Sequence, residues 1–294
     1  MSQYDIMSMT IPELEDFLES IGEKKFRAKQ IFEWIHQKRV FQYSHMTNIS
    51  KELQEKLLKS TLLYEPQIAK KYTSVEDGTI KYLFQLEDSH IIESVLMRHM
   101  YGNTVCISSQ VGCHMGCTFC ASTIDGLVRN LTPGEMLSQI YAIQNDSQEA
   151  ISNVVIMGSG EPLEKLDITL RFIELINHPK GQNLGQRHIT VSTCGLIPRI
   201  YELADHKLQI TLAISLHASN DETRKRTMPI ANKYSIKDII EACRYYIEKT
   251  NRRITFEYAL IQGVNDHKEN AAELSKILKG LLCHVNLIPV NEIE

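Results

Sequence analysis

The spacing of hydrophobic residues changes twice along this 294-residue chain. In the first segment, residues 1–66, apolar positions recur every three or four residues, which is the period of amphipathic helices. Thr10 and Glu13 can form a capping box at the start of the first helix. Two further helices are predicted over Phe26–Val40 and Lys51–Lys59. We therefore expect a helical accessory domain at the N-terminus.

Residues 67–103 show the period of two that is typical of strands. Ile80, Tyr82 and Phe84 alternate with polar residues after a turn at Glu76–Gly78. A second turn then leads into another apolar run. This pattern predicts a β-meander that links the helical domain to the rest of the chain.

Over residues 104–294, strand-length apolar runs alternate with helical stretches. This alternation indicates parallel strands joined by helices, an α/β fold. Six strands predict a partial (βα)6 barrel rather than a closed eight-stranded one, and functional residues in such barrels lie at the carboxyl ends of the strands. The expected strands are Thr104–Ser108, Asn153–Met157, His188–Thr193, Leu208–Ser215, Arg253–Leu260 and His284–Val290.

Composition limits the class of protein. Hydrophobic residues make up 43% of the chain and charged residues 23%, the balance of a soluble globular protein. Apolar runs are of strand length, and the first residues lack the basic and apolar regions of a secretory signal. We therefore expect a cytoplasmic protein without a membrane partner, in which the seven cysteines form no structural disulfides.

The charge distribution leaves the question of a nucleic-acid partner open. The formal net charge of −4 argues mildly against one. Between Lys24 and Arg39, however, six basic residues stand against one acid, Glu33. A solvated helix face and a face that follows a phosphate backbone would both look like this in sequence.

Cys113, Cys117 and Cys120 follow the first predicted barrel strand with C-x3-C-x2-C spacing. Three thiolates can bind three irons of a cubane cluster and leave the fourth iron open to another ligand. Two other interpretations remain. The cysteines could line a buried helix face, although two glycines within the segment would each cost a helix about 1 kcal/mol. They could also hold zinc with Cys106 as fourth ligand, although no second cysteine pair accompanies them.

Six short segments stand in a fixed order near predicted strand ends: Cys106–Cys113, Cys113–Cys120, Gly158–Pro162, Ser192–Thr193, Ser215–Ala218 and Asn286–Asn291. Together they resemble the RlmN/Cfr family of radical-SAM RNA methyltransferases, most closely its adenosine C2 branch. The resemblance covers nearly the whole chain. It implies that the barrel is a partial radical-SAM barrel and that the helical domain contacts RNA.

The resemblance also implies two cofactors. Cys113, Cys117 and Cys120 would hold one [4Fe–4S] cluster per chain. S-adenosylmethionine would chelate the open iron, and electrons would come from a donor such as flavodoxin or ferredoxin. The positions that match the family's S-adenosylmethionine site are Gly160, Glu161, Ser192, Ser215, Leu216, His217 and Asn291.

Two further residues match catalytic positions of the family. Glu93 corresponds to the proton acceptor, and Cys106 to one of two catalytic cysteines outside the cluster. In the family, the other cysteine is methylated by one S-adenosylmethionine, and a radical from a second molecule activates that methyl group for addition to adenine. Cys106 would then resolve the adduct through a disulfide. We interpret Cys194, Cys243 and Cys283 as structural.

The implied substrates are 23S rRNA and certain tRNAs, and the implied state is a monomer. The chain ends at Glu294, whereas the resemblance implies a further segment with the methyl-accepting cysteine. As printed, we expect it to bind the cluster and S-adenosylmethionine but not to complete methyl transfer. Two alternatives stay open: methylation at C8, as in Cfr, and a catalytically inactive RNA-binding paralogue.

Overall fold

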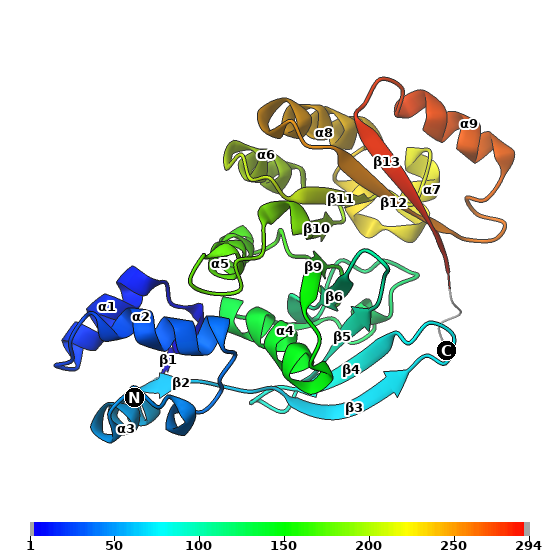
Figure 1. Ribbon diagram of the computed structural model, residues 1–294. Helices are drawn as coiled ribbons and strands as arrows, with labels where there is room; N and C mark the ends of the chain where they lie inside the picture. The colour runs from blue at the N-terminus through cyan, green and yellow to red at the C-terminus, as the bar shows by residue number, and fades with distance from the viewer. Residues whose placement is uncertain (1–2, 291–294) are drawn as a thin grey trace. The chain divides into compact units, whose positions relative to one another are not determined.

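A computed structural model describes residues 3–290 of the chain. The chain folds into two compact units (Figure 1). The first unit comprises the chain up to Ser108 together with Leu131–Val154 and Asp167–Gly185. The second comprises Ser109–Asn130, Val155–Leu166 and the chain from Gln186 onward. The predicted division into domains at residues 66 and 103 stays a prediction.

The first unit begins with the predicted helices. The Thr10 side chain accepts a hydrogen bond from the Glu13 amide, and the Glu13 carboxylate accepts one from the Thr10 amide at 2.7 Å, which confirms the capping box. Ser50 caps the third helix as expected. The helices are α1 (Ile11–Ser20), α2 (Arg27–Phe32) and α3 (Lys51–Ser60).

The second predicted helix is less regular than its sequence suggests. Regular α-helix ends at Phe32, and Glu33–Gln37 continues as a wider π-helical turn. Two short strands, β1 (Tyr4–Asp5) and β2 (Thr61–Leu62), pair in parallel and were not predicted. They are too short for a visible alternation of apolar and polar residues.

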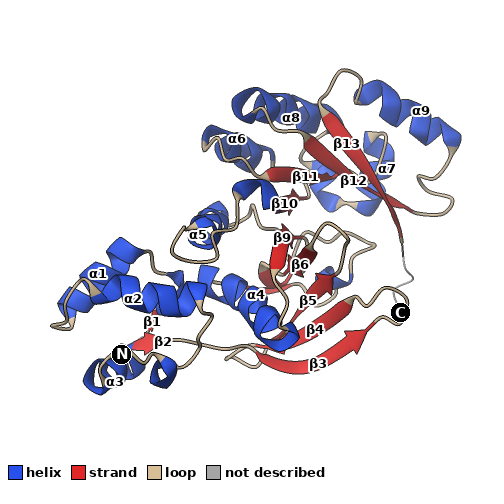
Figure 2. Ribbon diagram, viewed as in Figure 1, coloured by secondary structure: helices blue, strands red, loops and turns tan. Residues whose placement is uncertain are grey.

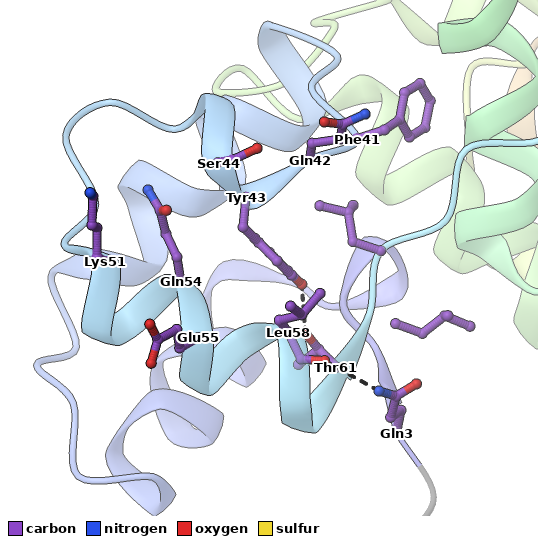
Figure 3. A pocket seen from close by; sticks show the side chains of 12 residues that line it. Gln3, Phe41, Gln42, Tyr43, Ser44, Lys51, Gln54, Glu55, Leu58 and Thr61 are labelled. Carbon is purple, nitrogen blue, oxygen red and sulfur yellow. Dashed lines mark hydrogen bonds between the residues drawn. The ribbon is translucent and has the colours of Figure 1, made fainter.

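A cavity of about 600 Å³ lies beside α3 in this unit (Figure 3). The hydroxyls of Tyr43 and Thr61 lie 2.5 Å apart at its wall. The side-chain amide of Gln3 donates to the Leu58 carbonyl at 3.3 Å. The first bond fastens β2 to the 3-10 turn Tyr43–His45, and the second fastens the N-terminal segment to α3.

The predicted meander is part of an antiparallel sheet. Its strands are β3 (Gln67–Thr73), β4 (Ile80–Gln85), β5 (Ile91–Met97) and β6 (Asn103–Ile107), each paired with the next. Helix α4 (Pro133–Ser147) covers one face of the sheet, where Tyr82 and Phe84 are buried (Figure 2). Strand β3 was not predicted, because all of its residues are exposed and no burial pattern marks it.

The six predicted barrel strands are confirmed, with ends shifted by up to three residues. In the second unit, β10, β11, β12 and β13 pair in parallel in that order. Helices connect them, and α6 packs against α8 (Figure 1). From β9 onward, across both units, the elements in chain order are β9 (Ile151–Ile156), α5 (Leu166–Asn177), β10 (Ile189–Thr193), α6 (Ile197–Asp205), β11 (Thr211–Ser215), α7 (Asp221–Thr227), α8 (Ile236–Thr250), β12 (Ile254–Leu260), α9 (Lys268–Ile277) and β13 (Cys283–Pro289).

None of the helices within residues 3–290 is both long enough and apolar enough to cross a bilayer.

Candidate active site

The three clustered cysteines lie in a loop, as the glycines predicted, and not on a helix. The hairpin of β7 (Gln110–Gly112) and β8 (Leu127–Asn130) closes the base of this loop. The Cys113 amide donates to the Gly126 carbonyl at 3.0 Å. The Thr123 hydroxyl donates to the carbonyls of Cys117 and Cys120 at 3.2 and 2.9 Å. The loop backbone is therefore held in place by hydrogen bonds from this unit alone.

Helix α7 and the 3-10 turn after it pack against the cysteine loop. The Thr118 amide donates to the Thr227 carbonyl at 2.9 Å. Gly116 has a φ of +70°, and a Cβ built on it would lie 3.3 Å from the Pro229 ring. Glycine therefore suits this position both for its backbone conformation and for the close packing of Pro229.

The cysteines line a cavity of about 150 Å³ at the carboxyl ends of the strands. Five residues predicted to bind S-adenosylmethionine line the same cavity: Gly160, Glu161, Ser192, Ser215 and His217. Leu216 is fully buried beside them and is not part of the lining. Asn291 lies outside the described residues. Segments separated by about a hundred residues in sequence thus meet at one site.

Burial favours the protonated form of two of the loop's thiols, Cys113 and Cys117. Loss of solvent raises the pKa of Cys113 and raises that of Cys117 to about 12. As free thiols, both are therefore protonated at neutral pH, and binding of a metal group would release their protons. Among residues 3–290, no three His, Cys, Asp or Glu side chains gather closely enough to hold a single metal ion. Three thiols lining one cavity instead have the donor chemistry of a cubane cluster, in which each thiolate binds a different iron.

Glu161 is a buried carboxylate with defined partners. One of its oxygens accepts the Cys194 amide at 2.7 Å, and the other accepts the Leu163 amide at 3.0 Å. Burial raises the pKa of Glu161, and these hydrogen bonds oppose the rise. The Thr193 and Cys194 side chains also hydrogen-bond this carboxylate, so Glu161 joins the turn after β9 to the end of β10.

Gly160 allows two segments of backbone to approach closely. Its φ is +111°, and a Cβ at this position would lie 2.6 Å from the Gln110 Cβ. The Gln110 side chain in turn accepts the Glu161 amide at 2.9 Å and donates to the Glu164 carboxylate at 2.7 Å. Gln110 thereby links the base of the cysteine loop to the turn that carries Gly160 and Glu161.

His217 has a defined tautomer. Its Nδ1 accepts the Ala259 amide at 2.9 Å, so in the neutral ring the proton resides on Nε2. Loss of solvent lowers the pKa of His217 to about 3, which keeps the ring neutral. The Phe119 ring, from the cysteine loop, contacts the imidazole edge-on at 4.8 Å between centroids. His217 thus offers a single N–H donor at the cavity wall.

Arg224 belongs to the site but was not predicted. Its guanidinium is fully buried and donates to the carbonyls of Cys194, Leu216 and Ser215 at 2.6, 3.2 and 3.3 Å. Nη1 is also buried and has no hydrogen-bond partner among the described residues. Arg224 therefore ties the ends of β10 and β11 to α7. The sequence did not indicate that Arg224 is buried at the site, because the charged run Asp221–Arg226 is typical of an exposed helix.

The remaining cysteines divide into two kinds. Cys194 lines the cavity, so its interpretation as merely structural was incomplete; its position directly after the Ser192–Thr193 segment was the available signal. Cys243 is buried in α8, and Cys283 begins β13. All seven cysteines lie within the described range, and none of them forms a disulfide in this structure.

The two predicted catalytic residues lie in the first unit. Glu93 is on β5 opposite Leu83, and its carboxylate pairs with Lys81 at 2.7 Å. Cys106 is on β6 opposite Val95. Their catalytic roles remain predictions.

The basic run near the N-terminus is partly engaged within its own unit. Lys25 pairs with Glu19 at 3.0 Å. The Arg27 guanidinium donates to the Asn48 carbonyl at 2.9 Å, and the Arg39 guanidinium donates to Asn145. The exposed residues of the run can still face a nucleic acid, so both interpretations of this segment stay open.

Comparison with known proteins shows two family matches. Residues 4–63 match the family described as "Ribosomal RNA large subunit methyltransferase N-terminal domain", and residues 107–275 match the "Radical SAM superfamily". A radical SAM methyltransferase from Sphaerobacter thermophilus has a similar structure, with a TM-score of 0.94 and 43% sequence identity over 98% of this chain and 86% of that chain.

Curated relatives agree with these matches. A protein of Clostridium novyi (strain NT) is 58% identical over 99% of this chain and 84% of its own length. One of Alkaliphilus oremlandii (strain OhILAs) is 58% identical over 100% of this chain and 85% of its own length. Both are named "Probable dual-specificity RNA methyltransferase RlmN". At this level of identity, the chain belongs to the RlmN family of radical-SAM RNA methyltransferases.

Proposed function

We propose that this protein methylates C2 of adenosine in 23S rRNA and in certain tRNAs. Membership of the radical-SAM superfamily implies a [4Fe–4S] cluster and S-adenosylmethionine. The observation that carries the proposal is the meeting of Cys113, Cys117 and Cys120 with strand-end polar groups around one cavity. The dual RNA specificity is the activity in the names of relatives that are 58% identical.

The three cysteines of the loop would hold the cluster through their thiolates. The chemistry that the cluster and S-adenosylmethionine supply when bound is one-electron cleavage of a sulfonium, the source of the radical that a carbon such as adenine C2 requires. The protein would contribute a loop backbone that is already fixed, because its amides and carbonyls are bonded to Gly126, Thr123 and Thr227.

The strand-end residues would orient S-adenosylmethionine. Glu161 can accept hydrogen bonds from an ammonium group, and His217 can donate one through Nε2–H. Ser192 and Ser215 offer hydroxyls on the same cavity wall. Gly160 lets a ligand approach the backbone. Leu216 and Asn291 are the remaining positions of this proposed set.

Glu93 would accept the proton that leaves adenine C2, and Cys106 would resolve the covalent adduct. The Lys81 ammonium, 2.7 Å from the Glu93 carboxylate, would help to position that group. A flavodoxin- or ferredoxin-type electron donor, a monomeric state and a cytoplasmic location remain predictions from the family resemblance.

The test is a methylation assay on the reconstituted protein, produced anaerobically from its complete reading frame. Unmodified tRNA transcripts and 23S rRNA fragments would be digested after reaction, and the nucleosides separated by mass spectrometry. We expect 2-methyladenosine and one methyl group per modified site. Formation of 8-methyladenosine would contradict the proposed position. Cleavage of S-adenosylmethionine without any RNA product would contradict the proposed substrate.

A further inference from the structure

The antiparallel sheet of the first unit has one packed face and one open face. On the packed face Tyr82, Phe84 and Leu96 are fully buried. Residues that point the opposite way on β4 and β5 stay accessible: the Lys81 and Glu93 side chains are 43% and 50% exposed. Every residue of β3, the last strand in the sheet order, is exposed.

Strand register identifies the residues of the open face. Residues directly opposite each other in an antiparallel pair project to the same face. Tyr72 lies opposite Lys81, Lys81 opposite Val95, and Val95 opposite Cys106. The strands β3, β4, β5 and β6 lie in that order in the sheet (Figure 2), so this row ends at Cys106, the predicted resolving cysteine.

A second row runs beside the first. Lys70 lies opposite Leu83, and Leu83 lies opposite Glu93. The open face thus carries Lys70, Tyr72 and Lys81 together with both predicted catalytic residues of this unit. Neighbouring strands are about 4.8 Å apart, so β3 and β5 are separated by roughly 10 Å, a distance that a short stretch of nucleotides can span.

The side chains on β3 form a cation and aromatic pair. The Lys70 ammonium lies 4.6 Å from the centre of the ring of Tyr72, a residue that is 47% exposed. Lys71, between them, projects to the opposite face, where its ammonium pairs with Asp146 at 2.8 Å. Lys71 is therefore paired with α4, whereas its neighbours Lys70 and Tyr72 face solvent and are accessible to a ligand.

These features fit an RNA strand in charge and in shape. Exposed aromatic rings on a sheet stack on unpaired bases, and lysines beside them attract phosphates. The face also leads directly to Glu93 and Cys106, which must reach the target base if their predicted roles are correct. A buried or acidic face would lack these properties.

We propose that the open face of β3–β5 binds the RNA nucleotides next to the target adenosine, with Tyr72 stacked on a base and Lys70 close to a phosphate. This inference rests on the proposed function. It adds a substrate-binding surface separate from the N-terminal basic run.

The test compares RNA binding by variants of adjacent residues. The holoenzyme, an unmodified tRNA transcript that the wild type methylates, and fluorescence anisotropy at several salt concentrations would be used. We expect Tyr72→Ala to weaken binding roughly tenfold, because stacking contributes that much per base. Lys70→Gln should weaken binding about threefold and reduce the salt dependence by about one phosphate contact. The control Lys71→Gln, the same change on the opposite face, should stay within twofold of the wild type.

Several outcomes would overturn the inference. If Tyr72→Ala and Lys70→Gln together leave affinity within twofold of the wild type, the face does not bind RNA, although the proposed function would stand. If the wild type neither binds nor methylates any transcript, both proposals fail. If Tyr72→Ala changes the sedimentation of the purified protein but not its RNA affinity, the face contacts a second copy of the chain and not RNA. Thermal unfolding would verify that each variant is folded, as expected for exposed positions.

Discussion

The cavity beside the cysteine loop and the open face of β3–β5 present polar groups in opposite surroundings. At the cavity, Glu161 and Arg224 are almost completely buried and bonded to backbone groups. On the open face, Lys81 and Glu93 form an ion pair that is about half exposed. A buried polar group costs free energy when its partners are removed, whereas an exposed pair contributes little to stability.

This difference in burial explains how the two regions can serve one reaction. A cofactor site must hold its groups in place before the ligand arrives, which burial and hydrogen bonds accomplish. A surface for a large RNA must be accessible, so its residues cannot be fixed by burial. Substitutions in the cavity should therefore reduce folding stability and cofactor uptake together, and substitutions on the open face should change RNA binding alone.

Gly160→Ala should cause the largest loss of folding stability. The new methyl group would meet Gln110, and alanine disfavours the backbone conformation at φ +111°. We expect a loss of roughly 3–5 kcal/mol in the free energy of unfolding, measured with urea. Gly280→Ala is the matched control, because Gly280 also has a positive φ but its Cβ would meet nothing within 4 Å. Equal losses for the two variants would contradict the role of close packing.

Arg224→Met should follow, with a loss of about 3 kcal/mol. Methionine fills much of the volume but leaves three carbonyl groups without their buried donor. The exposed Arg226, two residues further along α7, is the control, and Arg226→Met should change stability by less than about 0.5 kcal/mol. Similar values for both arginines in urea unfolding would show that the buried hydrogen bonds contribute little.

The buried residue His36 in the first unit should make the folding stability depend on pH. Loss of solvent lowers the pKa of His36 from 6.5 to about 3, and its Nδ1 lies 3.0 Å from the Tyr141 hydroxyl. Between these pH values the unfolded chain binds a proton that the folded chain does not, so stability falls as the pH is lowered. His36 should contribute about 1.4 kcal/mol per pH unit in the range between 6 and 3.5. His36→Gln should remove that part of the slope in urea unfolding measured across this range, and an unchanged slope would contradict the assignment.

Lys81→Met on the open face should cause the smallest loss of folding stability. Its ion pair with Glu93 is exposed, so the free energy of unfolding should change by less than about 1 kcal/mol. Lys71→Met should cost more, because Lys71 also contacts the buried Tyr82 ring and pairs with the less exposed Asp146. A larger loss for Lys81 than for Lys71 in thermal unfolding would reverse the distinction between the two faces.

Much of this architecture was predictable from sequence for a physical reason. Strands buried on both faces, such as β11, leave continuous apolar runs, and caps such as Thr10 with Glu13 leave short local signatures. Strand β3 was not predicted, because none of its residues is buried and its stabilising contacts, with β4 and with Asp146 of α4, leave no pattern in its own sequence. The π-helical turn after Phe32 depends on packing that spacing does not encode.

The site was predictable to a different degree. Cysteine spacing identified the loop, and motif resemblance identified five further residues that line the cavity. Resemblance did not indicate that Glu161 holds the Cys194 amide or that Arg224 joins two strand ends, because both depend on contacts between distant segments. The shared face of Lys81, Glu93 and Cys106 likewise depends on strand register, which hydrophobic pattern specifies only weakly on an open face.

Iron and acid-labile sulfide bound after anaerobic reconstitution test the central claim most directly. The wild type should bind close to four of each per chain, with the visible absorbance of a [4Fe–4S] cluster. Replacement of Cys113, Cys117 and Cys120 by alanine should abolish binding, whereas Cys283→Ala should bind like the wild type. Full iron and sulfide content in the triple variant would contradict the assignment of this loop as the cluster site.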